Sequence, residues 1–328
     1  MKNMENADKL KILITQPIHE SGEKLLIRKG YDVQVASDIT EATLAREIRD
    51  ISGLLVRTAK IPASVIDAGP ALRAIARHGV GYDNIDVAAA TRRKIPVCIT
   101  PQANAVSVAE HVLALMLALT KRIIPYDRAV RKNNWEIRDS YSAADLEGKT
   151  LGVIGMGRTG TLVCRKARAA FNMEVLVYSP RTSREMIEKA GGKKVSGIPE
   201  LLRVSDVVTL HVPLTGETSG LIGEAEFHMM KPSAFLINCA RGPVVNEEAL
   251  FRALKDGIIA GAGLDVFDPE PPGDDNPLFG LTNVVLSPHS AGLTAESVMR
   301  MSSQAAQSLI DILEGRRPEG VINPEVFQ

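Results

Sequence analysis

Three segments in the second half of the sequence place chemically active side chains after strand-like apolar runs. Arg241 comes directly after one run, and Asp265 ends the next. Glu270 lies in the proline-stiffened loop beyond Asp265, and His289 comes just after the last run. In sheets of parallel strands, ligands bind outside the carboxyl ends of the strands. One cation, two carboxylates and one imidazole are therefore expected to meet at one edge of a sheet.

This combination suits the transfer of a hydride to or from a small acid. Oxidation of an alcohol needs a base that takes the hydroxyl proton as hydride leaves carbon, and reduction needs an acid. Histidine titrates in the range that serves both directions. A nearby carboxylate orients an imidazole and raises its pKa, and an arginine holds a carboxylate and polarises a keto oxygen. Taken singly, these residues have plainer interpretations, namely an arginine in a surface ion pair and a histidine that caps a helix.

A glycine-rich segment at Leu151–Gly160 is typical of a dinucleotide-binding turn. Gly155, Gly157 and Gly160 form a GxGxxG pattern between a strand-like run and the helical pattern Thr161–Ala170. In such a turn the glycines serve a tight bend, close approach of the backbone to a pyrophosphate, and close packing of helix on strand. The helix N-terminus directs its N–H groups and positive dipole end at the phosphates. A purely structural glycine turn is the alternative.

The end of the next strand-like run bears on which cofactor binds. NAD sites carry an Asp or Glu there, about 20 residues past the glycines, to hold the ribose 2′-hydroxyl. Here Ser179 stands at that point, Arg181 and Arg184 bracket small hydroxyl residues, and no carboxylate precedes Glu185. Arginine can bind phosphate through two parallel hydrogen bonds, so the segment favours NADP over NAD. The alternative is a solvated charged loop that accepts NAD.

Two histidines and a cysteine are weaker candidates for catalysis. His111 lies inside an apolar helical stretch, where we expect it to make a hydrogen bond between domains. His211 ends a strand-like run, so its backbone is expected to approach the cofactor. Cys239 has no adjacent base, which favours packing beside the cofactor over a nucleophilic role.

Composition restricts the class of protein. The 39 basic residues balance 39 acidic ones, so no net charge recruits nucleic acid or an anionic membrane. No apolar stretch reaches the roughly 18 residues of a membrane span. Three widely separated cysteines exclude a disulfide framework and an obvious metal site, and the charged N-terminus leaves no room for a secretory segment. We expect a cytoplasmic protein.

Strand-like runs alternate with helical patterns along the chain, which predicts an α/β fold with doubly wound parallel sheets. The apolar stretch Ala105–Thr120 is expected to form a helix buried between two bodies, after which the alternation restarts. We predict a nucleotide-binding domain of residues 105–292, inserted into a substrate-binding domain of residues 1–104 and 293–328. The predicted strands are Lys11–Thr15, Tyr31–Val35, Gly53–Val56, Leu72–Ala76, Pro96–Ile99, Leu151–Ile154, Val175–Tyr178, Val207–His211, Ala234–Asn238, Gly261–Asp265 and Asn283–Leu286.

Together these motifs resemble the D-isomer-specific 2-hydroxyacid dehydrogenases, a family that includes phosphoglycerate, glyoxylate and hydroxypyruvate enzymes. The resemblance runs over most of the chain and is specific for the family, though not for a substrate. It implies a Rossmann nucleotide-binding domain inserted into a flavodoxin-like substrate-binding domain, and a homodimer formed through the nucleotide-binding domain. Besides the segments above, the matching motifs are Val56–Thr58, Arg77–Asp86, Ser107–His111 and His211–Thr215.

The resemblance implies roles for the four residues at the strand ends. Arg241 is expected to bind the substrate and to take part in catalysis. Glu270 and His289 are expected to form the carboxylate–imidazole pair of the acid–base relay, with His289 also touching the substrate. Asp265 is expected to hold the nicotinamide carboxamide.

The resemblance also places ligand contacts outside the catalytic set. The backbone N–H groups of Val80 and Gly81 are expected to bind the substrate carboxylate, with Arg57 nearby. The domains are expected to close around a cleft, with the chain crossing between them at Thr100–Pro101 and near Gly292. The full set of predicted cofactor-binding residues is Gly155, Gly157, Arg158, Thr159, Gly160, Ser179, Arg181, Arg184, His211, Val212, Pro213, Thr218, Cys239, Ala240, Asp265 and Gly292.

Ser179 departs from the NAD-using members of the family, which carry Asp there. Arg181 and Arg184 fall at the spacing of the NADP-using glyoxylate/hydroxypyruvate reductases, so we expect a reductase of a small 2-keto acid. The chain is also short for the regulatory extensions of the longer phosphoglycerate enzymes. Phosphite-oxidising relatives carry a lysine where Val80 stands, which argues against oxidation of phosphite by this chain. A phosphoglycerate dehydrogenase remains an alternative, as does an NAD(H)-sensing corepressor of the same fold, although the long flanking segments of the latter are missing.

Overall fold

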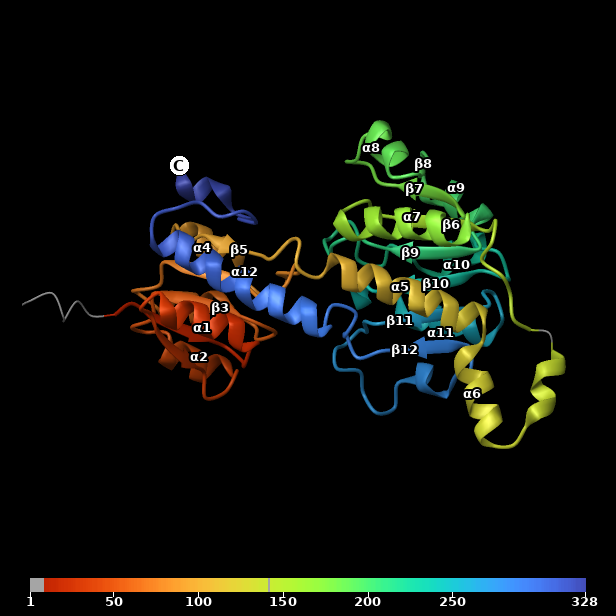
Figure 1. The fold of residues 1–328 in the computed structure, drawn as a ribbon, viewed down its shortest axis with the longest axis horizontal. Coiled ribbons are helices and arrows are strands. Elements are labelled where there is room, and N and C mark those ends of the chain that lie inside the picture. The colour runs from red at the N-terminus through yellow and green to blue at the C-terminus, as the bar shows by residue number, and fades with distance from the viewer. Residues whose placement is uncertain (1–8, 141) are drawn as a thin grey trace, which may run out of the picture. The chain divides into compact units, whose positions relative to one another are not determined.

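The computed structural model describes residues 9–140 and 142–328, which form two compact units (Figure 1). One unit comprises the chain up to Asn104 together with Leu293–Gln328, and the other is Ala105–Gly292. Residues 1–8, on which the prediction about a secretory segment rests, lie outside the described residues. Within the described ranges, no helix combines the length and the apolar character that crossing a bilayer requires.

In the described part of the first unit, five parallel strands form a sheet of order β2-β1-β3-β4-β5. This is the flavodoxin-like order of doubly wound sheets, as predicted. Strand β3 is buried along its whole length and β1 nearly so, because helices cover both faces of a parallel sheet and leave only apolar side chains inside. The strands are β1 (Lys11–Ile14), β2 (Asp32–Val35), β3 (Gly53–Val56), β4 (Ala74–Arg77) and β5 (Val97–Cys98).

A helix from the end of the chain completes the first unit. α12 (Ala295–Leu313) packs against α1 (Glu20–Arg28) and against β3 and β4. Gly22 allows this approach, because a Cβ there would lie 2.7 Å from the Ser302 carbonyl oxygen. The other helices of this unit are α2 (Glu41–Glu47), α3 (Ala63–Asp67), α4 (Val87–Arg92) and the 3-10 helix η4 (Pro324–Phe327).

In the described part of the second unit, seven parallel strands form a sheet of order β12-β11-β10-β9-β6-β7-β8. Counted from its own first strand, this is the 3-2-1-4-5-6 order of dinucleotide-binding sheets with one strand added. The order reverses between β6 and β9, whose carboxyl ends flank the position where such sheets bind ligands. The strands are β6 (Thr150–Ile154), β7 (Glu174–Tyr178), β8 (Lys193–Lys194), β9 (Val207–Leu210), β10 (Phe235–Asn238), β11 (Gly261–Leu264) and β12 (Val284–Leu286).

Apolar side chains pack on both faces of this second sheet. On one face, α5 (Ala105–Thr120) and α7 (Arg158–Phe171) contribute buried residues such as Met116 and Val163. On the other face, buried residues such as Phe227 come from the shorter helices. These are α9 (Ile198–Val204), α10 (Glu224–Met229) and α11 (Glu247–Lys255). The unit also contains α8 (Arg184–Lys189) and the 3-10 helices η2 (Gly242–Val244) and η3 (Pro277–Gly280).

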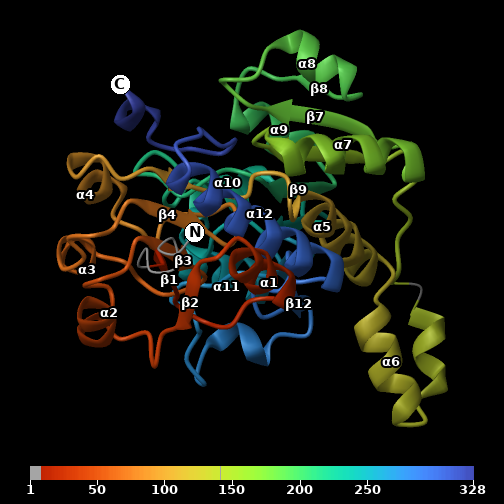
Figure 2. The ribbon, with the colours of Figure 1, turned by 60° about the vertical axis from the view of Figure 1, so that its left-hand side comes forward.

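The sequence patterns did not predict β8 or the segment after α5. β8 has only two residues, both lysines, so it carries no periodic signal. After α5 the chain continues into α6 (Ile123–Arg131) and the 3-10 helix η1 (Trp135–Ser140). In both views this α6–η1 arm extends away from the sheet of the second unit (Figures 1 and 2). Its amphipathic pattern is short and has no core of its own to cover.

Candidate active site

The glycine segment forms a tight connection between β6 and α7. Gly155 has a φ of +95°, and a Cβ on it would lie 2.5 Å from the His211 carbonyl oxygen. A Cβ on Gly160 would lie 2.4 Å from the Gly155 carbonyl oxygen, so α7 can pack this closely only on a glycine. Gly155 therefore allows the tight bend, and Gly160 allows the close packing of helix on strand, as the sequence pattern predicts.

Gly157 is the residue that leaves room for a ligand. It is the N-cap of α7, it makes no side-chain capping bond, and a Cβ there would meet open space. The first turn of α7 thus begins at an exposed helix end with no side-chain cap from Gly157. A dinucleotide pyrophosphate fits this cradle, because it brings negative charge to the positive end of a 14-residue helix.

The end of β7 carries no carboxylate. Ser179 is buried, and its Oγ lies 2.8 Å from the Thr182 Oγ1, which closes a small turn. The Thr182 N–H donates to the Ser179 carbonyl oxygen at 3.3 Å across the same turn. Arg181 and Arg184 follow with exposed side chains. The charge at this point of the edge is therefore positive.

The loop after β9 lies against the glycine turn. The His211 N–H donates to the Ile154 carbonyl oxygen at 2.7 Å, and the Val212 side chain lies beside Gly155. The Thr218 hydroxyl donates to the Pro213 carbonyl oxygen at 2.6 Å, which holds this loop in a compact form. Burial lowers the pKa of His211 to about 4, so its imidazole is neutral at pH 7.

Cys239 and Arg241 follow β10 in a segment that Asn238 clamps from both sides. The Asn238 Nδ2 donates to the Arg241 carbonyl oxygen at 2.9 Å, and its Oδ1 accepts from the Ala240 N–H at 3.0 Å. Burial, and then the charge of Asp265, raise the pKa of the Cys239 thiol, which makes it a poor nucleophile. Sequence reasoning missed Asn238, although an amide at the end of an apolar strand was a visible signal.

Arg241 is brought close to the Glu270 loop by a glycine. A Cβ on Gly242 would lie 1.8 Å from the Phe267 carbonyl oxygen, so only glycine permits this contact. The Arg241 side chain is partly buried, and its charge acts on the Glu270 carboxyl. The structure thus brings together two of the residues that the sequence placed on neighbouring strand ends.

Glu270 and His289 form a hydrogen-bonded pair. The Glu270 Oε2 lies 2.8 Å from the His289 Nδ1, and the Glu270 Oε1 accepts from the Phe267 N–H at 3.0 Å. Burial alone would raise the pKa of Glu270. The hydrogen bonds from His289 and Phe267, with the charges of His289 and Arg241, outweigh burial and hold that pKa below its ordinary value. The pair therefore consists of a carboxylate that orients an imidazole, and the imidazole is half exposed.

Asp265 is a buried anchor for the turn that carries His289. Its Oδ1 accepts from the Ser287 hydroxyl at 2.6 Å and from the Ser290 N–H at 2.9 Å, and its Oδ2 accepts from the Ala291 N–H at 2.9 Å. The carbonyl of the same residue accepts from the His289 N–H at 2.8 Å. His289 needs this support, since its φ of +51° is unfavourable for a residue with a Cβ. The role of Asp265 towards the nicotinamide carboxamide stays a prediction.

His111 corrects one expectation from the sequence. Its Nε2 lies 2.8 Å from the Ser287 Oγ and 3.7 Å from the Asp265 Oδ1. Both partners belong to the same unit as His111, so this hydrogen bond does not join two domains. Helical periodicity shows that α5 is buried but not which neighbour its polar residue meets. His111 therefore extends the network that holds the His289 turn.

The predicted substrate-binding residues Arg57, Val80 and Gly81 lie in the first unit, after the carboxyl ends of β3 and β4. The Arg57 N–H donates to the Thr15 Oγ1 at 3.1 Å, and its side chain donates to the Pro17 carbonyl oxygen at 3.1 Å. Val80 is 38% exposed. Within their own unit, these residues occupy the edge where doubly wound sheets bind ligands.

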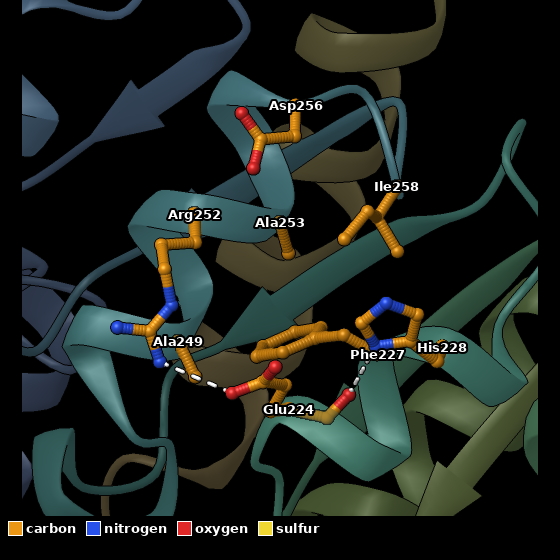
Figure 3. Close-up of a pocket in the computed structure, with 8 residues that line it drawn as sticks. All are labelled: Glu224, Phe227, His228, Ala249, Arg252, Ala253, Asp256 and Ile258. Atoms are coloured by element: carbon orange, nitrogen blue, oxygen red, sulfur yellow. Dashed lines mark hydrogen bonds and ion pairs between the residues drawn. The ribbon is translucent and has the colours of Figure 1, made fainter.

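A separate pocket of about 160 Å³ lies between α10 and α11 (Figure 3). Its Arg252 is already paired with Glu224 at 3.3 Å and with Glu248 at 2.6 Å. The lining residues are Glu224, Phe227, His228, Ala249, Arg252, Ala253, Asp256 and Ile258. None of the candidate catalytic residues is among them, so this pocket is distinct from the site at the carboxyl edge.

Comparison with protein families gives a match over residues 113–291 to the NAD binding domain of the D-isomer specific 2-hydroxyacid dehydrogenases. Glyoxylate reductase from Korarchaeum cryptofilum is 40% identical over 98% of this chain and 98% of its own length. The chain belongs to this family. The resemblance stated from the sequence motifs is thereby confirmed.

D-3-phosphoglycerate dehydrogenase from Archaeoglobus fulgidus is 41% identical over 96% of this chain, but this chain spans only 59% of that relative. Among solved structures, a protein from Thermus thermophilus matches with a TM-score of 0.88, 35% identity, and coverage of 95% of this chain and 100% of that one. An NADPH-dependent glyoxylate/hydroxypyruvate reductase from Sinorhizobium meliloti matches with a TM-score of 0.85, 29% identity, and coverage of 96% and 97%. These likenesses confirm the predicted fold of two parallel-sheet α/β domains.

Proposed function

We propose that the protein is an NAD(P)-dependent reductase of small 2-keto acids, with glyoxylate or hydroxypyruvate as the substrate. The observation that carries this proposal is the hydrogen-bonded pair of Glu270 and His289, 2.8 Å apart, with the charge of Arg241 acting on it. Because the Nδ1 of His289 faces Glu270, its Nε2 is the nitrogen left for a substrate. The pair alone is common to many enzymes, and family membership gives it this chemistry.

In this mechanism each residue has one task. A bound reduced nicotinamide cofactor supplies the hydride. Arg241 holds the substrate carboxylate and polarises the keto oxygen. His289 donates a proton from its Nε2 to that oxygen as the hydroxyl forms. The Glu270 carboxylate keeps the ring oriented and stabilises its charged form. In the direction of oxidation, His289 accepts the proton instead.

The proposed contacts with cofactor and substrate are divided between the two units. The domain of residues 105–292 binds the cofactor, with Gly157, Arg158 and Thr159 at the pyrophosphate. The domain of residues 1–104 and 293–328 binds the substrate carboxylate, through the backbone of Val80 and Gly81 and through Arg57. The remaining cofactor contacts are Gly155, Gly160, His211, Val212, Pro213, Thr218, Cys239, Ala240, Asp265 and Gly292.

Within NAD(P) use, we propose a preference for NADP. The turn after β7 offers the exposed guanidinium groups of Arg181 and Arg184, and Ser179 stands where a carboxylate would repel a 2′-phosphate. The solved Sinorhizobium relative is named as NADPH-dependent, which supports the same preference.

The choice of substrate rests on the names of the relatives. The glyoxylate reductases from Korarchaeum cryptofilum and Pyrococcus furiosus are 40% and 39% identical to this chain, and the solved Sinorhizobium relative is named as a glyoxylate/hydroxypyruvate reductase. The phosphoglycerate dehydrogenases are 41% identical. A phosphoglycerate dehydrogenase activity is the second candidate, and phosphohydroxypyruvate is included in the test.

We further propose a homodimer formed through the nucleotide-binding domain by way of the α6–η1 arm. Val130 is 50% exposed and Trp135 is 65% exposed on this arm. Apolar side chains gathered on an exposed surface mark interaction sites, and the partner proposed here is a second copy of the chain. Analytical ultracentrifugation should give twice the mass of 35.4 kDa. A monomer at micromolar concentration would contradict the proposal.

The experiment that tests the function is steady-state oxidation of NADPH and of NADH with glyoxylate, hydroxypyruvate, pyruvate and phosphohydroxypyruvate. Turnover of NADPH with glyoxylate or hydroxypyruvate is the expected result. Turnover with NADH alone would retain the reductase and contradict the NADP preference. A preference for phosphohydroxypyruvate would favour the second candidate. Tight cofactor binding without turnover of any of the four would favour a nucleotide-sensing protein.

A further inference from the structure

A lysine from the neighbouring strand holds the turn after β7 in place. Lys194 lies on β8 opposite Val177 of β7, and its Nζ donates a hydrogen bond to the Thr182 carbonyl oxygen at 2.6 Å. The Lys194 side chain is partly buried, whereas Arg181, next to Thr182, is exposed. The bond ties the turn to the sheet, while the Arg181 side chain stays exposed.

Thr182 is the residue through which this turn is fixed. Its N–H donates to the Ser179 carbonyl oxygen, its hydroxyl bonds with the Ser179 hydroxyl, and its carbonyl oxygen accepts from Lys194. The first two bonds close the turn on itself. Only the third of these bonds connects the turn to another strand.

Lys194 also brings a charge that its partner does not neutralise, because a carbonyl oxygen accepts one of the three ammonium donors without cancelling the charge. The adjacent Lys193 is different. Successive side chains on a strand point to opposite faces, and Lys193 is exposed, with its charge acting on Glu200. Two neighbouring lysines of the same strand therefore differ in whether they reach the turn.

We propose that Lys194 is a positioning residue for the ribose 2′-phosphate of NADP(H), because it holds the Ser179–Thr182 turn so that Arg181 can meet that phosphate. This inference rests on the NADP preference proposed above and names the residue that supports it. The selection of the cofactor then depends on β8, a strand about 40 residues beyond the glycine turn.

The test is the binding of two cofactor fragments to the full-length chain, measured by isothermal titration calorimetry. The wild type should bind adenosine 2′,5′-bisphosphate at least tenfold more tightly than AMP. Lys194→Met keeps the aliphatic length but removes the donor and the charge. It should weaken binding of the bisphosphate about tenfold and leave AMP within about twofold, because the displaced Arg181 loses its bond to the 2′-phosphate, and only the bisphosphate carries that group.

Matched variants separate positioning from other roles. Lys193→Met removes the same charge from the same strand and should leave both affinities within about twofold. Lys194→Arg retains a donor and a charge and should restore most of the bisphosphate affinity. In an Arg181→Ala background, Lys194→Met should cost much less than it does in the wild type, since residues that act together are not additive. Fully additive losses would contradict positioning through the turn.

The outcomes distinguish this inference from the proposed function. If the wild type prefers the bisphosphate and Lys194→Met keeps that preference, the assignment to Lys194 is wrong and the NADP preference stands. If Lys194→Met weakens both fragments equally and lowers Tm, the residue is merely structural and the proposal fails. If the wild type shows no preference, both the NADP preference and the role of Lys194 are wrong. Turnover of glyoxylate, measured separately, depends on neither outcome.

Discussion

The ends of β10 to β12 and the end of β7 lie on the same edge of one sheet, yet their side chains are held in different ways. Asp265 is 1% exposed and fixes the His289 turn through several buried hydrogen bonds. Arg181 and Arg184, by contrast, are exposed beyond a turn with one bond to a neighbouring strand. The side chains of the proposed catalytic end are preorganised, whereas at the proposed phosphate end only the backbone turn is held and the arginine side chains are exposed.

The difference corresponds to what each end has to do. Proton transfer requires an imidazole within hydrogen-bond reach of one oxygen, and small misplacements are costly. An arginine that binds a phosphate can become ordered when the ligand arrives, at the expense of side-chain entropy. Substitutions at the first end should therefore affect turnover, and substitutions at the second should affect the choice of cofactor.

The largest effect is expected for His289→Ala. Loss of the proposed general acid should lower kcat about 10³-fold, within the usual range for such groups, while the Kd for NADPH stays within about twofold. Steady-state kinetics and fluorescence titration of NADPH measure the two quantities. His228→Ala, which removes an exposed histidine on α10, is the control and should be silent. Activity equal to wild type in His289→Ala would remove His289 from the mechanism.

Asp265→Asn should come next and break the preorganised end without touching the pair. An amide would place a donor against backbone N–H groups that already donate, which leaves a buried group unpaired at a cost of about 1–3 kcal/mol. We expect Tm to fall by several degrees. We expect kcat to fall about thirtyfold, because His289 is displaced from the position that proton transfer requires. Asp268→Asn, an exposed carboxylate three residues on, is the matched control. Unchanged Tm and kcat would show that the buried network does not hold the turn.

Arg181→Ala should act at the second end alone. The KM for NADPH should rise about tenfold, since one charged hydrogen-bond partner of the 2′-phosphate is lost, while the KM for NADH stays within about twofold. Lys189→Ala, which removes an exposed cation at the end of α8, provides the comparison. A parallel rise for both cofactors would show that the arginine does not read the 2′-phosphate.

The smallest effect concerns pH. Because the pKa of Glu270 is lowered in the folded protein, its carboxylate stabilises the fold above the unfolded value near 4.5, and this contribution disappears as pH falls through the folded value. At pH 7 the wild type should therefore melt roughly 2 °C above Glu270→Gln, and the gap should narrow below pH 4.5. Differential scanning calorimetry from pH 7 to pH 3.5 measures it. A difference in Tm that widens as the pH falls would contradict a lowered pKa of Glu270 in the folded protein.

Sequence patterns were sufficient for the parts of the site that lie close together along the chain. The glycine turn is a local feature, because Gly155, Gly157 and Gly160 serve one bend and one helix end. The placement of Arg241, Glu270 and His289 after apolar runs was also readable, since buried parallel strands appear as apolar runs and their carboxyl ends share an edge. The meeting of Glu270 with His289, 19 residues apart, agrees with what the family resemblance implied.

The sequence by itself thus determined the alternation of strands and helices, the chemistry available at the strand ends, and the family. Only the tertiary structure decided which buried partners hold those residues: Asp265 with the turn 22 to 26 residues away, His111 with Ser287, and Lys194 with Thr182. The physical reason is that periodicity reports burial, which is a property of one element. A hydrogen bond depends on the direction of two side chains from different elements, and that direction exists only once the elements have packed.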